Sequence, residues 1–354
     1  MAYSLNQKIK DLEPYEPISG TYKIRLDANE SPFSYTDEIK EKIAEAVKTI
    51  DYNRYPDPMA EELCEAFADF YGVDKKLVTA ANGSDELISI IETSFLMKGE
   101  KLLFIAPDFS MYKFYSSICE AECVQINKNP ELEITADEMI KAIKDSGAKC
   151  VIFSNPCNPT GQGLDREAIR KIVSSVDALI VDDEAYMDFW DQSMIGETEN
   201  YDNLIVLRTA SKAFGSAALR LGFAVANEKI TRAMKAVKSP YNVNSVSQKV
   251  GTIIYREKEY FKKSLSSIVY NRDLLYNGLR NCSCFTDDFR VYPTVTNFVF
   301  VKTTMALDIW KYLLSKSVAI RYMGEYIRIS AGTDEETAFV LAEIENYLKN
   351  LKKN

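Results

Sequence analysis

The chain of 354 residues contains no histidine. The commonest metal ligand and neutral-pH general base is therefore absent, which excludes every nucleophile system that depends on a histidine base. Proton transfer near neutral pH must fall to a perturbed lysine, tyrosine, cysteine or carboxylate, or to a cofactor. We expect no bound metal.

Long apolar runs and an excess of basic residues are also missing. No stretch approaches the ~18 consecutive apolar residues of a membrane span, and the N-terminus has no apolar signal region. The 43 basic residues are outnumbered by 52 acidic ones, which gives a formal net charge of −9 and no general field for nucleic acid. These absences predict a cytoplasmic protein with neither nucleic acid nor membrane as a partner.

What is present is an alternation of two kinds of segment. Short apolar runs at 101–107, 149–156, 178–184 and 203–208 read as buried strands, and helical patterns lie around 135–145 and 165–176. Nearly continuous apolar strands separated by helices indicate a mostly parallel sheet covered on both faces. The fold class is therefore α/β.

The pattern of predicted helices and strands changes after about residue 240. A long helical region from 245 to 280 is followed by an alternating strand at 296–303, two short strands within 318–330 and a final helix that ends near 351. We predict a large domain over 30–242. A smaller α+β domain is expected from 1–29 and 243–354, with the N-terminal arm packed on it.

Polar side chains follow the predicted strands of the large domain, where ligands of open parallel sheets bind. They are Asn158, Asp183, Tyr186, Ser211 and Lys212. Further upstream, residues 83–85 (Gly-Ser-Asp) stand directly before a predicted helix, whose free N–H groups favour an anion. Taken singly, each feature has a structural interpretation as a turn, a helix cap or an ion pair. Together they predict one pocket.

The ordered set of motifs "NPCNPTG" (155–161), "DEAY" (183–186) and "SKAFGSAALRLG" (211–222) resembles the fold-type-I, pyridoxal-phosphate-dependent aminotransferases of class I and II. Four further features resemble the histidinol-phosphate aminotransferase branch: "EPYEP" (13–17), "LDANESPF" (26–33), "NRYPDP" (53–58) and the arginines Arg321 and Arg328. The resemblance covers nearly the whole chain. It implies a large domain with a mostly parallel seven-stranded sheet flanked by helices.

The resemblance also implies roles around the cofactor ring. Lys212 would form the Schiff base with the aldehyde of pyridoxal 5′-phosphate, and Asp183 would pair with the protonated ring nitrogen. Asn158 and Tyr186 would hydrogen-bond the ring 3-oxygen, and Phe109 would stack on the ring.

By the same resemblance, a second group of residues would hold the cofactor phosphate. They are Gly83, Ser84, Asp85, Ser211 and Arg220, with backbone amides of residues 84 and 85 assisting from the helix N-terminus. Tyr55 would reach this phosphate from a second subunit, so the resemblance implies a homodimer.

The implied reaction transfers the amino group of L-histidinol phosphate to 2-oxoglutarate by a ping-pong mechanism, a step of histidine biosynthesis. Arg321 and Arg328 would bind the substrate anion, with Tyr15 and Asn29 near the substrate. Only six residues separate the two arginines, where the branch usually has a longer loop.

Three alternatives stay open at this point. The first is an aminotransferase for aromatic or other amino acids, and the second is a lyase similar to threonine-phosphate decarboxylase. The third, a non-catalytic binding protein on the same fold, is opposed by the intact Lys212.

Overall fold

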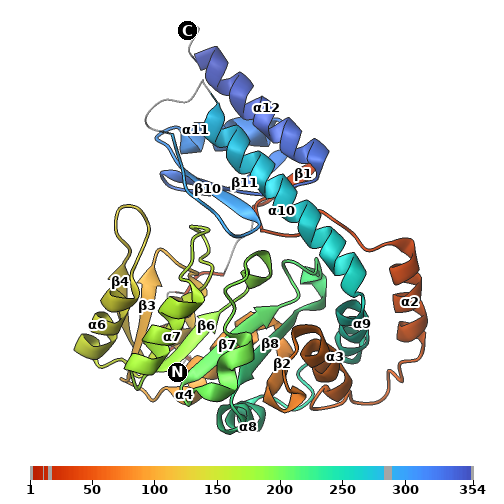
Figure 1. The fold of residues 1–354 in the computed structure, drawn as a ribbon, viewed down its shortest axis with the longest axis vertical. Helices are drawn as coiled ribbons and strands as arrows, with labels where there is room; N and C mark the ends of the chain where they lie inside the picture. The colour runs from red at the N-terminus through yellow and green to blue at the C-terminus, as the bar shows by residue number, and fades with distance from the viewer. Residues whose placement is uncertain (1–2, 11, 15–17, 283–288, 352–354) are drawn as a thin grey trace.

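The structure is a computed structural model that describes residues 3–10, 12–14, 18–282 and 289–351. Its strands form a seven-stranded sheet and a five-stranded sheet, which lie one above the other in Figure 1. Within the described parts of the chain, no helix is long and apolar enough to cross a membrane.

The seven-stranded sheet has the order β2-β8-β7-β6-β5-β3-β4. Its strands are β2 (Val78–Asn82), β3 (Lys101–Ala106), β4 (Glu122–Asn127), β5 (Cys150–Ser154), β6 (Leu179–Asp183), β7 (Leu204–Thr209) and β8 (Leu221–Ala226). Only β8 runs antiparallel to its neighbours, so the predicted mostly parallel seven-stranded sheet is confirmed.

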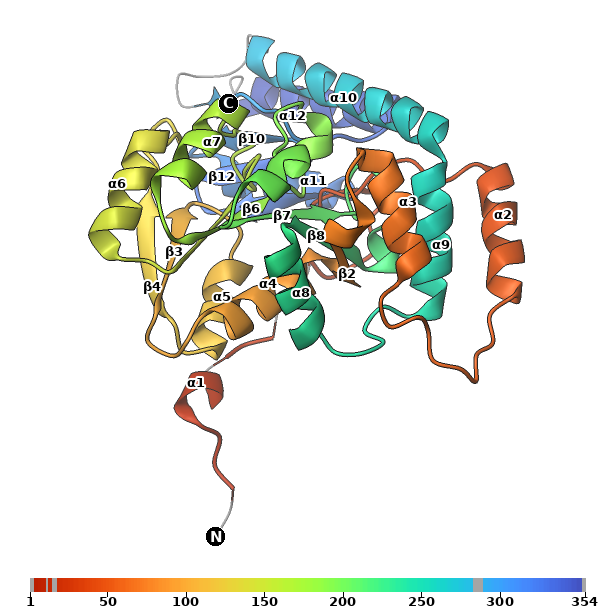
Figure 2. The ribbon, with the colours of Figure 1, turned by 60° about the horizontal axis from the view of Figure 1, so that its bottom comes forward.

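Helices cover both faces of this sheet because successive strand residues point to opposite sides. Leu103 and Val151 pack on one side, while their neighbours Leu102 and Ile152 pack on the other. One face is covered by α3 (Glu61–Tyr71), α6 (Ala136–Ser146), α7 (Arg166–Ser175) and α9 (Ser245–Arg256). The other is covered by α4 (Gly83–Phe95), α5 (Met111–Ile118) and α8 (Glu228–Val237), which lie below the sheet in Figure 2.

The five-stranded sheet has the order β1-β11-β12-β10-β9. Its strands are β1 (Ile24–Leu26), β9 (Arg290–Val291), β10 (Phe298–Lys302), β11 (Val318–Met323) and β12 (Tyr326–Ser330). A separate apolar core joins this sheet to α10 (Lys258–Asn281), α11 (Ala306–Ser315) and α12 (Asp334–Leu351). The N-terminal strand β1 pairs in parallel with β11, with Ile24 opposite Val318.

The helical region predicted over 245–280 is two helices rather than one. Glu257, with φ −85° and ψ 58°, interrupts the helical backbone between α9 and α10. The carboxylate of Glu257 accepts a hydrogen bond from Lys42 of α2 (Asp37–Lys48) at 2.8 Å. The break lets α9 pack on α3 while α10 runs on to the five-stranded sheet (Figure 1).

The remaining elements are short. They are α1 (Gln7–Lys10) and the 3₁₀ turns η1 (Lys75–Leu77), η2 (Met187–Phe189), η3 (Ile195–Asn200) and η4 (Ala217–Leu219). Lys8 in α1 donates a hydrogen bond to the carbonyl oxygen of Ile118 at 3.0 Å, at the end of α5. Figure 2 shows this N-terminal segment beside α5, on the side of the seven-stranded sheet.

Candidate functional site

Several of the predicted site residues lie where the carboxyl ends of β5, β6 and β7 face the five-stranded sheet. Lys212 follows β7, and its Nζ donates to the carbonyl oxygen of Ala28 at 3.0 Å. The same nitrogen lies 5.8 Å from the ring centroid of Tyr186, which follows β6. The half-buried Lys212 amine is therefore held between the N-terminal segment and the large sheet.

Asp183 is the buried carboxyl at the end of β6. Its Oδ2 accepts a hydrogen bond from the Tyr112 hydroxyl at 2.8 Å, and its Oδ1 accepts one from the Ala185 N–H at 3.2 Å. Burial outweighs these bonds and raises the pKa of Asp183 to about 7. A carboxyl in this position is stabilised as the anion by a cationic group bound beside it.

Phe109 contacts Tyr112, the hydrogen-bond partner of this carboxyl. Its half-buried ring meets the Tyr112 ring edge to face, with centroids 5.6 Å apart. Both residues belong to the turn and first residues of α5, after β3. Phe109, Tyr112 and Asp183 thus form a connected set.

Asn29 joins the two sheets at the site. It has φ 54°, a left-handed conformation that asparagine tolerates better than most residues. Its Nδ2 donates to the Tyr186 hydroxyl at 2.9 Å, and its Oδ1 accepts from the Ser330 hydroxyl of β12 at 3.0 Å. The predicted Asn29 therefore contacts both the large-sheet side and the small-sheet side of the site.

Arg328 also reaches the site from β12. Its guanidinium donates to Asn158 Oδ1 and to the carbonyl oxygen of Asp27, the latter at 2.9 Å. Arg321 stands directly opposite Arg328 in the antiparallel pair of β11 and β12. Directly opposite side chains share one face of a sheet, so the two predicted arginines point to the same side.

A cradle for an anion lies at the start of α4. Gly83, with φ 78°, opens this 13-residue helix, and a Cβ on Gly222 of β8 would come within 2.2 Å of the Gly83 carbonyl carbon. Arg220 crosses the helix start, where its Nη2 pairs with Asp85 at 3.1 Å. Close backbone approach, an arginine and a helix N-terminus together favour a phosphate.

Ser211 lies buried beside this cradle. Its hydroxyl accepts a hydrogen bond from Thr209 at 3.0 Å. Ser84 occupies the second position of α4, directly after Gly83.

Among the described residues, Tyr55 makes no hydrogen bond or ring contact with the other predicted site residues. Tyr55 is 81% exposed and stacks on Tyr241 with ring centroids 4.6 Å apart. Tyr15 lies outside the described residues.

Sequence reasoning missed Tyr112, Ser330 and the backbone oxygens of Asp27 and Ala28. Tyr112 stands three residues after Phe109, and this proximity in sequence was the available signal in "DFSMY". Ser330 and the two backbone oxygens carry no local signal, because their partners lie far away in the chain.

Comparison with known proteins identifies the family. Residues 21–344 match the family model "Aminotransferase class I and II". The chain belongs to this family, as its motifs predicted.

The chain is also similar to individual curated proteins over nearly its full length. The chain is 40% identical over 338 residues to the histidinol-phosphate aminotransferase of Clostridium novyi, covering 94% of each chain. It is 38% identical over 348 residues to that of Clostridium kluyveri, covering 97% of this chain and 98% of the relative.

Solved structures share the fold. A histidinol-phosphate aminotransferase from Sinorhizobium meliloti, in complex with pyridoxal-5′-phosphate, matches with a TM-score of 0.88 at 22% identity over 99% of both chains. L-threonine-O-3-phosphate decarboxylase from Porphyromonas gingivalis matches with a TM-score of 0.78 at 21% identity, over 92% of this chain and 99% of that one. The predicted fold class and enzyme class are confirmed.

Proposed function

We propose that this protein is a pyridoxal-phosphate-dependent aminotransferase that moves the amino group of L-histidinol phosphate to 2-oxoglutarate, in histidine biosynthesis. The carrying observation is the placement of Lys212 against Tyr186, in a site that also contains the buried Asp183. The full-length relatives at 38–40% identity support the choice of substrate.

The residues present fit the cofactor. The cradle of Gly83, Ser84, Ser211 and Arg220 suits its phosphate, and the glycine at 222 leaves room for the helix start that would bind it. Phe109 is available to stack on the ring, and Asp183 suits a protonated ring nitrogen, whose charge would lower the raised pKa of this carboxyl. When bound, the cofactor supplies a ring that accepts the electrons left on the substrate carbon after proton removal.

Side chains of the protein would supply the attachment, proton transfer and orientation that the reaction needs. Lys212 would hold the cofactor through its amine and, when that amine is free, would serve as the base that moves a substrate proton. Asp183 would keep the ring nitrogen protonated. Asn158 and Tyr186 would orient the ring, and both are positioned by hydrogen bonds from Arg328 and Asn29.

Arg321 and Arg328 are the proposed binding site of the substrate anion. Like charges directly opposite one another destabilise a sheet, and an anion bound between the two guanidinium groups would offset this repulsion. Guanidinium groups bind both a phosphate and a carboxylate through paired hydrogen bonds. Two half-reactions with different anions can therefore use one site. The proximity of Tyr15 to the substrate stays a prediction.

We also propose a cytoplasmic homodimer in which Tyr55 reaches the phosphate cradle of the second subunit. The 81% exposure of Tyr55 supports this, because a large aromatic side chain on the surface is available for an interface.

The division into 30–242 and 1–29 with 243–354 stays a prediction. The two separate sheets support it. The packing of α9 on α3 opposes the boundary at residue 242, because α9 belongs to the range 243–354 and yet packs on the side of the large sheet.

The test is a half-reaction followed by absorbance near ~420 nm, where the lysine-bound cofactor absorbs. L-Histidinol phosphate, phenylalanine and threonine phosphate are added separately to the loaded protein. We expect histidinol phosphate to remove the band at the lowest concentration, and Lys212→Ala to lack it. Faster loss with phenylalanine, or carbon dioxide release from threonine phosphate, would contradict the proposed substrate.

A further inference from the structure

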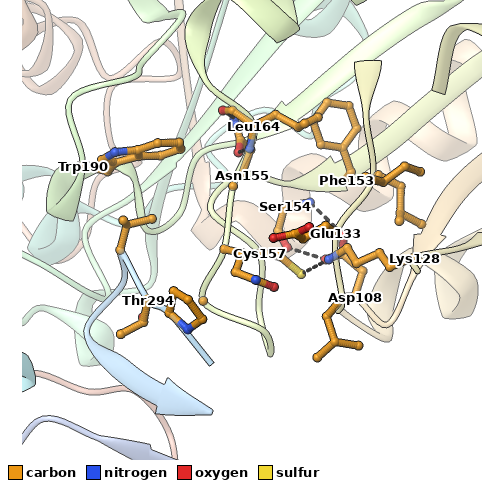
Figure 3. A pocket seen from close by; sticks show the side chains of 18 of the residues that line it. Asp108, Lys128, Glu133, Phe153, Ser154, Asn155, Cys157, Leu164, Trp190 and Thr294 are labelled. Atoms are coloured by element: carbon orange, nitrogen blue, oxygen red, sulfur yellow. Dashed lines mark hydrogen bonds between the residues drawn. The ribbon is translucent and has the colours of Figure 1, made fainter. Parts of the chain in front are cut away.

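A cavity of about 440 Å³ lies next to the segment 155–161, and none of the proposed steps uses it. Its walls include Asp108, Lys128, Cys157, Trp190 and Thr294, drawn in Figure 3. The segment that carries Cys157 also carries Asn158, which contacts Arg328 in the proposed active site.

Lys128 and Cys157 meet in the wall of this cavity. Lys128 follows β4, and its Nζ donates to Cys157 Sγ at 2.8 Å (Figure 3). It also donates to the carbonyl oxygen of Pro107 at 3.3 Å. Cys157 is a free cysteine whose residue surface is 3% exposed. Small molecules that enter the cavity therefore meet a sulfur already in contact with an amine.

The charges around this pair favour a reactive sulfur. Burial acts to lower the pKa of Lys128, but Cys157 and Asp108 outweigh it and the pKa is raised. An ammonium group in contact with a cysteine favours the thiolate, which is the nucleophilic form. Burial raises the pKa of the Cys64 thiol to about 12 and also raises the pKa of Cys150, and within the described ranges no lysine donates a hydrogen bond to either sulfur.

We propose that Lys128 and Cys157 form a redox modification site, in which a peroxide oxidises Cys157 and Lys128 then captures the oxidised sulfur as a sulfur–nitrogen cross-link. The proposal rests on the contact, the cavity and the charges, and goes beyond the aminotransferase reaction.

The two steps balance without a further reactant. In the first, the Cys157 thiolate attacks one oxygen of hydrogen peroxide, a sulfur–oxygen bond forms and the oxygen–oxygen bond breaks. The sulfur loses two electrons to the peroxide, and the departing hydroxide takes a proton from the Lys128 ammonium to give water. In the second, the neutral Lys128 amine attacks the sulfenic acid, a sulfur–nitrogen bond forms, and hydroxide leaves with an amine proton as a second water.

The cross-link ties the end of β4 to the segment next to Asn158. Because Asn158 is proposed to orient the cofactor, we expect oxidation to lower transaminase activity and a thiol reductant to restore it. This consequence rests on the proposed function, whereas the cross-link itself does not.

The experiment treats the cofactor-loaded protein with hydrogen peroxide and follows its cysteine and lysine peptides by mass spectrometry. We expect a joined 128/157 peptide about 2 Da lighter than the sum of its two reduced parts, reversed by dithiothreitol. Cys157 should react roughly tenfold faster than Cys64, which serves as the control within the same molecule.

Two variants separate the steps. Lys128→Arg keeps the cation without a condensing amine, so Cys157 should stop at a dimedone-reactive sulfenic acid. Lys128→Met removes the cation, so oxidation of Cys157 should slow to the rate of Cys64; thermal unfolding shows that each variant is folded.

The proposal is overturned if wild-type protein accumulates sulfenic acid without a cross-link, or if Lys128→Met reacts as fast as wild type. Both results are read from masses, so they leave the proposed aminotransferase function untouched.

Discussion

The hydroxyl of Tyr112 is the closest partner of the buried Asp183 carboxyl, at 2.8 Å. Its hydrogen bond lowers the pKa of Asp183 against the larger effect of burial. Tyr112→Phe should therefore raise this pKa further above about 7 and weaken pyridoxal-phosphate binding roughly tenfold, the typical effect of losing a hydrogen bond to a charged group. A fluorescence titration of the unloaded protein with the cofactor measures this change.

The matched control for this prediction is Tyr115→Phe, a half-buried tyrosine of the same helix. It should bind the cofactor as wild type does. If both variants lost cofactor affinity equally, the loss would come from changing a tyrosine of α5 and not from the missing hydrogen bond to Asp183.

Glu92 is another buried carboxyl, in the last turn of α4. Neither of its oxygens has a hydrogen-bond partner, and burial raises its pKa to about 9. A raised carboxyl pKa contributes stability below its ordinary value of 4.5, and this stability is lost as the pH rises through about 9. Glu92→Met should therefore stabilise the protein by on the order of 2 kcal/mol near pH 8, with a smaller gain near pH 5.

Thermal unfolding of Glu92→Met at the two pH values provides the measurement. The exposed Glu41→Met of α2 is the control and should leave the unfolding temperature within error of wild type. A gain that is the same at both pH values would contradict the electrostatic explanation and point to packing instead.

Among the secondary-structure elements, the close approach of β8 to the start of α4 is the most sensitive to a change of size. A Cβ at position 222 would lie 2.2 Å from the Gly83 carbonyl carbon and 2.4 Å from the Ser84 nitrogen, both backbone atoms. Gly222→Ala must displace the helix start, so we expect cofactor affinity to fall by at least ~10-fold, because the helix N–H groups then miss the phosphate.

Gly196→Ala is the matched control, because nothing lies within 4 Å of a Cβ built there. Cofactor titration and thermal unfolding are measured for both variants. Gly222→Ala with unchanged affinity would contradict the placement of the phosphate at α4.

Elements of the large sheet were predictable from the sequence because each is coded locally. The apolar runs at 101–107 and 178–184 became β3 and β6, and the region around 135–145 became α6, which Thr135 and Glu138 open with reciprocal hydrogen bonds. The break at Glu257 was not predicted, because helical periodicity continues through it and its carboxylate is bound by Lys42, far away in sequence.

The candidate site was also predictable only where its residues are marked by local motifs. Asp183 and Lys212 were each identified by a motif of neighbouring residues. By contrast, the Ala28 oxygen that contacts Lys212 comes from the distant N-terminal segment. Only a folded chain brings such partners together.

At the scale of the whole molecule, the proposed exchange of Tyr55 between subunits predicts complementation. Tyr55→Ala and Lys212→Ala proteins should each have little activity alone. After joint unfolding and refolding, mixed dimers contain one complete site, and random pairing restores at most about a quarter of wild-type activity.

The assay is transaminase activity against the mixing ratio, and it should peak at equal amounts. A mixture no more active than its components would show that Tyr55 does not serve the partner's site. Each variant refolded alone provides the baseline.

Residues 27–29 contribute three contacts to the site: the Asp27 oxygen to Arg328, the Ala28 oxygen to Lys212 and the Asn29 amide to Tyr186. These partners lie 301, 184 and 157 positions further along the chain. During synthesis the N-terminal segment leaves the ribosome first, yet it has no complete set of partners until β12 has been made. The pocket is therefore completed only near the end of translation, so truncated nascent chains that already contain the whole large sheet should not retain the cofactor.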